Sequence, residues 1–197
     1  MRHAAKIPWL IMLAVLLPMP ALFAVEPARP PEANRMRPGD APTPYSAQQI
    51  RKACPDGGFV RFRIETPDSP AVFSVVRFLE GTDAETTLES GMEDAQGKPA
   101  GAPQTLRVKW TDLQGHASFH ESDTRIEAAS AMTPLGIFNC WKYTVRKKTE
   151  TGESVATYWF AKDLPGPPVL LEEHLGGKKI KTMTQIERKP LPAAGGR

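Results

Sequence analysis

The chain has 197 residues, of which 41% are hydrophobic and 24% are charged, and its formal net charge at pH 7 is +3. This length suffices for one domain with a single hydrophobic core. Removing an N-terminal leader that contains Arg2 and Lys6 lowers the charge from +3 to +1. So small a charge, with no concentrated basic patch, disfavours a nucleic-acid partner.

The N-terminus has the three-part pattern of a secretory signal peptide, which we place at residues 1–24. A basic start is followed by an apolar run from Ile7 to Leu17, and small residues precede Ala24, the expected cleavage point. An uncleaved membrane anchor is the alternative, but the run would span only about 17 Å as a helix, against about 30 Å for a hydrocarbon core. The sequence therefore predicts Sec-type export to the periplasm or the exterior, with no membrane span after cleavage.

Proline content separates the expected domain from its flanks. Residues 25–44 contain six prolines mixed with charged residues and alanines. Such a composition buries too little apolar surface to offset the entropy lost on ordering. We expect an extended linker at 25–44, a β-rich domain at 45–188 and a disordered tail at 189–197.

Short segments of strand-like pattern fill the expected domain. Ser46 is placed to cap a short helix that ends at Ala53. Val60, Phe62 and Ile64 then alternate with charged residues, which indicates a strand with one wet face. Further strands are expected at 72–79, 85–92, 106–110, 125–132, 137–146, 155–161, 169–175 and 178–187. The predicted fold class is mainly β: a single curved, half-barrel-like antiparallel meander with a short N-terminal helix.

Cys54 and Cys140 are the only cysteines of the chain. Because an exported protein folds in an oxidising compartment, we favour a disulfide that joins the helix region to the 137–146 strand. Closing so long a loop would stabilise the fold by about 4 to 5 kcal/mol in the chain-entropy model. Two separate buried thiols are the alternative. No CxxC pair or histidine cluster accompanies the cysteines, so their spacing does not predict a metal site.

His116 and His120 are the first candidates for chemistry. On a helix, residues four apart share a face and could bind one zinc ion, but in a strand the same spacing separates them by about 13 Å. The segment also lacks the glutamate that follows the first histidine of a metalloprotease helix. No nucleophile elbow or phosphate-binding glycine loop is present. We therefore assign no catalytic residue, metal or cofactor.

Aromatic side chains concentrate on three of the expected strands. Core packing explains any single one of them, because aromatic residues favour half-buried sheet surfaces. Together they also suit an apolar pocket on the concave side of a curved sheet, which would hold a hydrophobic small molecule. The candidate ligand-binding residues are Trp110, Trp141, Tyr143, Trp159, His116 and His120.

Two motifs in the second half of the chain resemble those of a known group. They read GIFNCWKYTV from Gly136 and YWFAKDLPGPPV from Tyr158. They resemble the C-terminal signature of uncharacterised exported bacterial proteins, in which a Gly-x-Phe-x-Cys strand precedes a Tyr-Trp-Phe-Ala-Lys-Asp strand. More distantly, the pattern is similar to periplasmic domains whose curved sheet is like that of lipoprotein carriers. The resemblance supplies no catalytic residues to transfer.

Three functional hypotheses follow, in order of preference. The first is a non-enzymatic periplasmic or secreted binding module for a hydrophobic small molecule or a component of the cell envelope. The second is a hydrolase or isomerase that uses His116 or His120 with a carboxylate. The third is a structural partner-binding module whose proline-rich linker reaches an envelope component.

Overall fold

The computed structural model describes residues 29–190, so the expected signal peptide lies outside the described residues, as do residues 191–197. Lys189, the first residue of the expected tail, belongs to the last strand. The elements, in chain order, are η1 (Glu32–Asn34), α1 (Ala47–Ala53), β1 (Phe59–Glu65), β2 (Val72–Gly81), β3 (Glu85–Glu93), β4 (Gln104–Lys109), α2 (Trp110–Gly115), η2 (Glu121–Asp123), β5 (Thr124–Thr133), β6 (Gly136–Thr149), β7 (Gly152–Ala161), β8 (Leu170–Leu175) and β9 (Lys178–Lys189).

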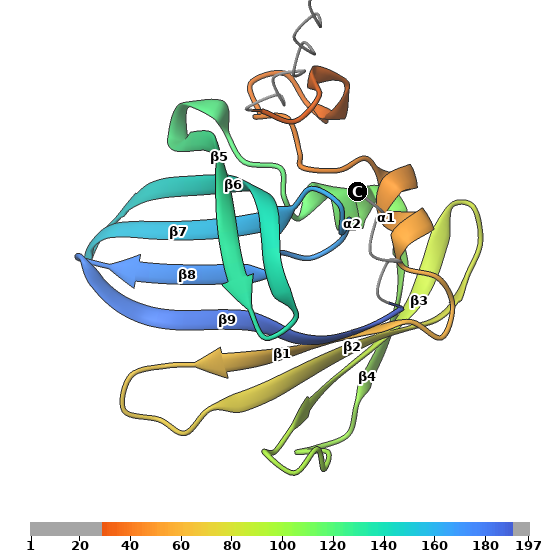
Figure 1. Ribbon diagram of the computed structural model, residues 1–197. Helices are drawn as coiled ribbons and strands as arrows, with labels where there is room; N and C mark the ends of the chain where they lie inside the picture. Colours follow the sequence, from red (N-terminus) through yellow and green to blue (C-terminus); the bar gives the residue numbers. More distant parts are fainter. Residues whose placement is uncertain (1–28, 191–197) are drawn as a thin grey trace, which may run out of the picture.

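These strands form one antiparallel sheet in the order β4-β3-β2-β1-β9-β8-β7-β6-β5. Two meanders, β1–β4 and β5–β9, meet where the first strand pairs with the last, from Phe59 opposite Lys189 to Glu65 opposite Thr182. The sheet is strongly curved, so that β1–β4 turn away from β5–β9 (Figure 1). The predicted mainly β class, with a curved antiparallel sheet and a short N-terminal helix, is confirmed.

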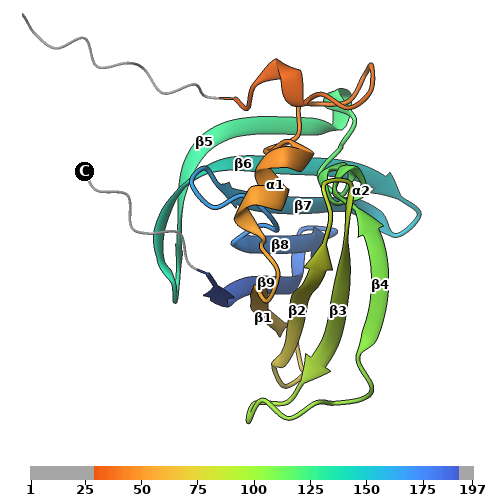
Figure 2. The ribbon, with the colours of Figure 1, turned by 90° about the vertical axis from the view of Figure 1, so that its right-hand side faces the viewer.

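The two edge strands of the sheet, β4 and β5, follow each other in the chain. The connection between them leaves β4 at Lys109, forms α2 and η2, and enters β5 at Thr124. Because β4 and β5 lie at opposite ends of the strand order, this connection has to cross the open side of the curved sheet. Helix α2 therefore lies beside α1 over the concave face (Figure 2).

The first helix begins at a side-chain cap, whereas the second begins one residue earlier than the turn expected after Trp110 and has no side-chain cap. Ser46 accepts a hydrogen bond from the Gln49 amide, while the Gln49 side chain accepts one of 2.8 Å from the Ser46 amide. This capping box starts α1 as predicted. Trp110, expected at the end of a strand, instead opens α2, and its indole nitrogen donates to the Thr82 carbonyl at 3.0 Å.

The proline-rich segment expected as an extended linker is described from Arg29 onward, and its second half packs into the fold. Ala41 and Thr43 are both 0% exposed. The Ala41 amide donates to the Phe119 carbonyl at 2.8 Å, and Asp40 forms a β-bridge with His120. The partners of the segment, such as the Phe119 carbonyl and the Tyr143 hydroxyl, are distant in the sequence, so composition alone does not indicate this packing.

The predicted disulfide between Cys54 and Cys140 is wrong in this structure, where both residues are buried free thiols. Each sulfur has its own surroundings. The Cys54 sulfur lies 4.0 Å from the Pro165 carbonyl and 3.7 Å from the Arg188 guanidinium. The Cys140 thiol donates to the Phe138 carbonyl at 3.5 Å within its own strand, and packs in a separate apolar cluster. The alternative, two separate buried thiols, describes what is found.

Candidate functional site

An apolar cavity of about 350 Å³ lies between the concave face of the sheet and the two helices. Both meanders and both helices contribute to its wall. Its larger apolar side chains include Phe62 of β1, Phe78 of β2, Leu88 of β3, Leu113 of α2 and Phe160 of β7. The wall of the cavity therefore depends on contacts between segments that are distant in the sequence.

The register of the sheet explains why the cavity wall is apolar. Ile64 on β1 is paired with Met183 on β9, and Met183 is paired with Leu171 on β8. Leu171 is in turn opposite Tyr158 on β7, which is opposite Tyr143 on β6. Because paired residues in a sheet share a face, this row of side chains crosses five neighbouring strands on the concave side. Three of them, Tyr158, Leu171 and Met183, line the cavity.

Few polar side chains line the cavity, and one of them, Gln114, already has its hydrogen bonds. The Gln114 side-chain oxygen accepts from the Ala47 amide at 2.8 Å. Its nitrogen donates to the Asn34 carbonyl at 3.2 Å and to the Thr43 hydroxyl at 3.0 Å. Gln114 thus joins α2 to α1 and to the proline-rich segment. His116 also lines the cavity, and it makes no hydrogen bond to a carboxylate within the described range.

Of the six candidate ligand-binding residues, His116 lines the cavity and the four aromatic ones lie outside its wall. Trp110 stacks on Phe78 with 6.3 Å between ring centroids, which places it behind the cavity. Trp159 has its ring 5.9 Å from the Lys142 ammonium, and by alternation it faces away from Phe160 and the concave side.

Trp141 and Tyr143 are on the concave side, but both side chains are buried against other residues of the core. Trp141 is 9% exposed, and its ring centroid lies 5.9 Å from that of Tyr45. Tyr143 is 0% exposed, and its hydroxyl donates to the Pro42 carbonyl at 2.6 Å. Both residues support the wall of the cavity from behind.

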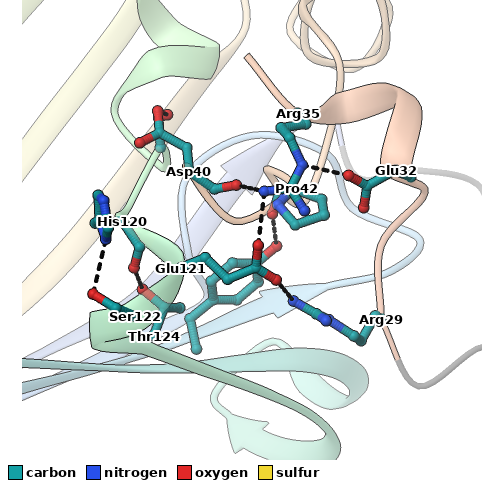
Figure 3. Close-up of polar contacts among 11 residues, drawn as sticks. Arg29, Glu32, Arg35, Asp40, Pro42, His120, Glu121, Ser122 and Thr124 are labelled. Atoms are coloured by element: carbon teal, nitrogen blue, oxygen red, sulfur yellow. Dashed lines mark hydrogen bonds and ion pairs between the residues drawn. The ribbon is translucent and has the colours of Figure 1, made fainter. Parts of the chain in front are cut away.

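His120, the sixth candidate, belongs to a polar cluster at the junction of the proline-rich segment and η2 (Figure 3). Its Nδ1 lies 2.8 Å from the Ser122 hydroxyl, which donates to the Asp123 carboxylate at 2.9 Å. The direction of the first contact depends on the tautomer of the imidazole ring, whereas the ionised Asp123 carboxylate can only accept. His120, Ser122 and Asp123 are therefore linked within one short segment around η2.

The remaining charges of this cluster form ion pairs that hold the proline-rich segment against η2 (Figure 3). Arg29 and Arg35 each lie 2.9 Å from a carboxylate oxygen of Glu121, and Arg35 also pairs with Glu32. The hydrogen bond from Arg29, followed by the charge of Arg35, lowers the pKa of Glu121. Arg29, Glu32 and Arg35 of the segment therefore have a structural role, because their ion pairs attach the segment to η2.

The described residues lack the patterns of a metal site and of a membrane-spanning helix. Within residues 29–190 there is no group of three or more His, Cys, Asp or Glu side chains arranged to hold a metal ion. Over the same described range, no helix has both the length and the apolar character needed to cross a membrane.

The cavity residues that sequence inspection missed are mainly aliphatic and phenylalanine side chains. Phe62, Phe78 and Leu88 belong to expected strands, but their local sequence does not assign them to a pocket. The available signal is the alternation of apolar and charged residues around Phe62 in β1. That alternation identifies a buried face, but it does not distinguish a filled core from a hollow one.

No protein-family model matches the chain, and no curated protein matches it in sequence. Two solved structures are similar to it at low identity. A protein of Bacteroides fragilis, described as exported and as having a YmcC-like fold, is 12% identical with a TM-score of 0.45, over 68% of this chain and 96% of that one. A protein of Parabacteroides distasonis, described as a lipoprotein, is 10% identical with a TM-score of 0.46, over 69% and 96%. At these values the likeness is remote and carries no argument about function.

Proposed function

We propose that this chain is an exported, non-enzymatic binding protein that holds a hydrophobic small molecule between its curved sheet and its two helices. The observation that carries the proposal is the apolar cavity of about 350 Å³. Small-molecule sites are typically concave and largely apolar, with volumes of about 300 to 1,000 Å³. The signal-peptide pattern at the N-terminus supports the exported location.

The wall of the cavity is suited to a ligand with a hydrocarbon chain, because most of its lining side chains are apolar. Each methylene group that such a ligand buries there would contribute about 0.8 kcal/mol to binding.

The test is direct binding of a neutral hydrocarbon probe, 1-dodecanol, by isothermal titration calorimetry. We expect saturable binding by the wild-type protein. Ala117 lines the cavity and is 9% exposed, so Ala117→Trp should fill part of the space and weaken binding at least tenfold. Ala102→Trp places the same side chain on an exposed loop between β3 and β4 and should leave binding unchanged.

Thermal unfolding supplies a second measurement. A ligand that binds the folded state alone stabilises it by about 2.7 kcal/mol at 100 times its dissociation constant. The wild-type protein and Ala102→Trp should show this stabilisation with 1-dodecanol, while Ala117→Trp should not. Absence of saturable binding in the wild-type protein, or equal binding by both variants, would contradict the proposal.

A further inference from the structure

Arg188, near the end of β9, is a buried cation with no anionic partner in the described part of the chain. The residue is 5% exposed. Its Nη2 donates to the Ala53 carbonyl at 3.1 Å and to the Pro165 carbonyl at 2.7 Å, and it forms no ion pair with a carboxylate there. Buried charges are normally paired, because the loss of hydration is costly.

The neighbouring thiol of Cys54 does not neutralise this charge. Burial raises the pKa of Cys54, and this effect outweighs the attraction of the nearby guanidinium. The thiol is therefore uncharged at neutral pH. Burial also lowers the pKa of Arg188 from its ordinary value of 12.5, yet an arginine side chain remains protonated in proteins.

Two residues of β9, Gln185 and Arg188, carry buried polar side-chain atoms without a hydrogen-bond partner. Arg188 Nη1 is buried without a hydrogen-bond partner, and so are both side-chain polar atoms of Gln185, which is 0% exposed. Gln185 is opposite Phe62 and Arg188 is opposite Val60, across a register shift between Arg61 and Phe62. Since Phe62 and Val60 both line the cavity, this register places Gln185 and Arg188 on the same concave face.

Gly166 connects these polar groups with the cavity. It lines the cavity wall, and a Cβ added to it would lie 3.2 Å from Arg188 Nη1. Its φ of +134° also favours glycine. The absence of a side chain lets the backbone of the Pro165–Pro168 turn approach the guanidinium closely. Arg188 Nη1 thus lies against Gly166 at this end of the cavity, next to the wall, although neither Arg188 nor Gln185 is itself a lining residue.

We propose that the ligand is amphipathic, with its apolar chain in the cavity and an anionic headgroup bound by Arg188 and Gln185 at the Gly166 end. This inference rests on the proposed function. A carboxylate or phosphate oxygen offers acceptors to Arg188 Nη1 and to the Gln185 amide, and hydrogen bonds between charged groups are the strong ones. The anion would supply the counter-charge that Arg188 lacks.

The experiment compares three probes with the same chain: dodecanoate, dodecyl phosphate and 1-dodecanol. Dissociation constants are measured by calorimetry for the full mature chain. We expect at least one of the two anions to bind at least tenfold more tightly than the alcohol, and the tighter of the two identifies the headgroup. Arg188→Met should abolish this preference while it changes the affinity for 1-dodecanol less than threefold.

Two further variants separate the site from general effects. Gln185→Glu places an anion on the same face of β9 as Arg188, so it should weaken binding of the charged probes at least tenfold and leave 1-dodecanol binding in place. It also tests the inference if Arg188→Met does not fold. Arg63→Met is the matched control, because Arg63 is half exposed and pairs with Glu65 away from the cavity. It should leave all three affinities unchanged.

The outcomes distinguish this inference from the function on which it rests. If the wild-type protein binds the anions and the alcohol equally, the headgroup site is refuted and the apolar binding function stands. If Arg188→Met retains the preference for an anion, the assignment to Arg188 is likewise refuted. If no probe binds, both proposals fall.

Discussion

The phenol of Tyr143 donates a hydrogen bond of 2.6 Å to the carbonyl oxygen of Pro42, across 101 residues of sequence. Both side chains are fully buried. Proline has no amide hydrogen of its own, so its carbonyl is the one backbone group that can anchor this position. The contact fixes the proline-rich segment on β6 and holds it above the helices that cover the cavity.

Replacing Tyr143 with phenylalanine should destabilise the fold. Tyr143→Phe keeps the ring but leaves the buried Pro42 carbonyl without a donor, which costs about 1 to 3 kcal/mol of unfolding free energy. Urea denaturation measures the loss. Tyr158→Phe is the control, because the Tyr158 hydroxyl makes no hydrogen bond to the described residues. Equal stability of the two variants would show that the Pro42 contact contributes nothing.

Gln114 offers a second test of how the helices are held over the concave face. Its side chain satisfies the Ala47 amide and the Thr43 hydroxyl together. Gln114→Leu keeps the approximate size but removes these partners, and we expect a loss of about 1 to 3 kcal/mol. Hydrogen exchange should also accelerate at the start of α1.

The control for Gln114 is Gln48→Leu, in which an exposed residue of α1 undergoes the same chemical change. Its unfolding free energy should stay within about 0.5 kcal/mol of wild type, as is usual for surface substitutions. Slower exchange at Ala47 in Gln114→Leu than in Gln48→Leu would contradict the assigned role of Gln114.

Most of the fold could be predicted because its strands carry strong local signals. The alternation of Val60, Phe62 and Ile64 directly specifies the buried face of β1. The pairing of β1 with β9 could not be predicted in the same way, because it depends on the curvature of the whole sheet. The burial of Thr43 could not be predicted either, because Thr43 is held by contacts with residues distant in the sequence, such as the hydrogen bond from the Gln114 side chain.

The candidate site was less predictable than the fold. The sequence predicts a curved sheet with an apolar concave side, but it does not distinguish wall residues such as Leu88 from residues of a filled core. The sequence does not indicate that Arg188 is buried on the concave face. The register shift beside Phe62 changes the alternation along β9, so simple period-two counting from Met183 would turn Arg188 away from the concave face.

The free thiols can be counted chemically. Without reductant, the folded protein should react slowly with Ellman's reagent at pH 8, because Cys54 and Cys140 are buried and their pKa values are raised by burial. After unfolding in urea, both thiols should react in full. Cys54→Ser and Cys140→Ser should each leave one reactive thiol. An unfolded, unreduced wild-type chain with no reactive thiol would show a disulfide instead.

The same burial predicts a loss of stability at alkaline pH. Burial raises the pKa of Cys140 from its ordinary value of 9.0 to about 11, and it also raises the pKa values of Tyr45 and Tyr143. Between about pH 9 and pH 11, the folded state therefore binds more protons than the unfolded state. Since stability falls with pH wherever the folded state binds more protons, the contribution is complete below pH 9 and is lost above it.

Urea denaturation at intervals from pH 7.5 to pH 11 measures this dependence. The wild-type unfolding free energy should decline steadily above pH 9. Cys140→Ala removes one of the responsible groups, so its decline between pH 9 and pH 11 should be shallower even though its stability at pH 7.5 is lower. Ser130→Ala, at an exposed position of β5, should follow the wild-type slope. A Cys140→Ala slope as steep as that of wild type would mean that this thiol ionises equally in the folded and unfolded chains.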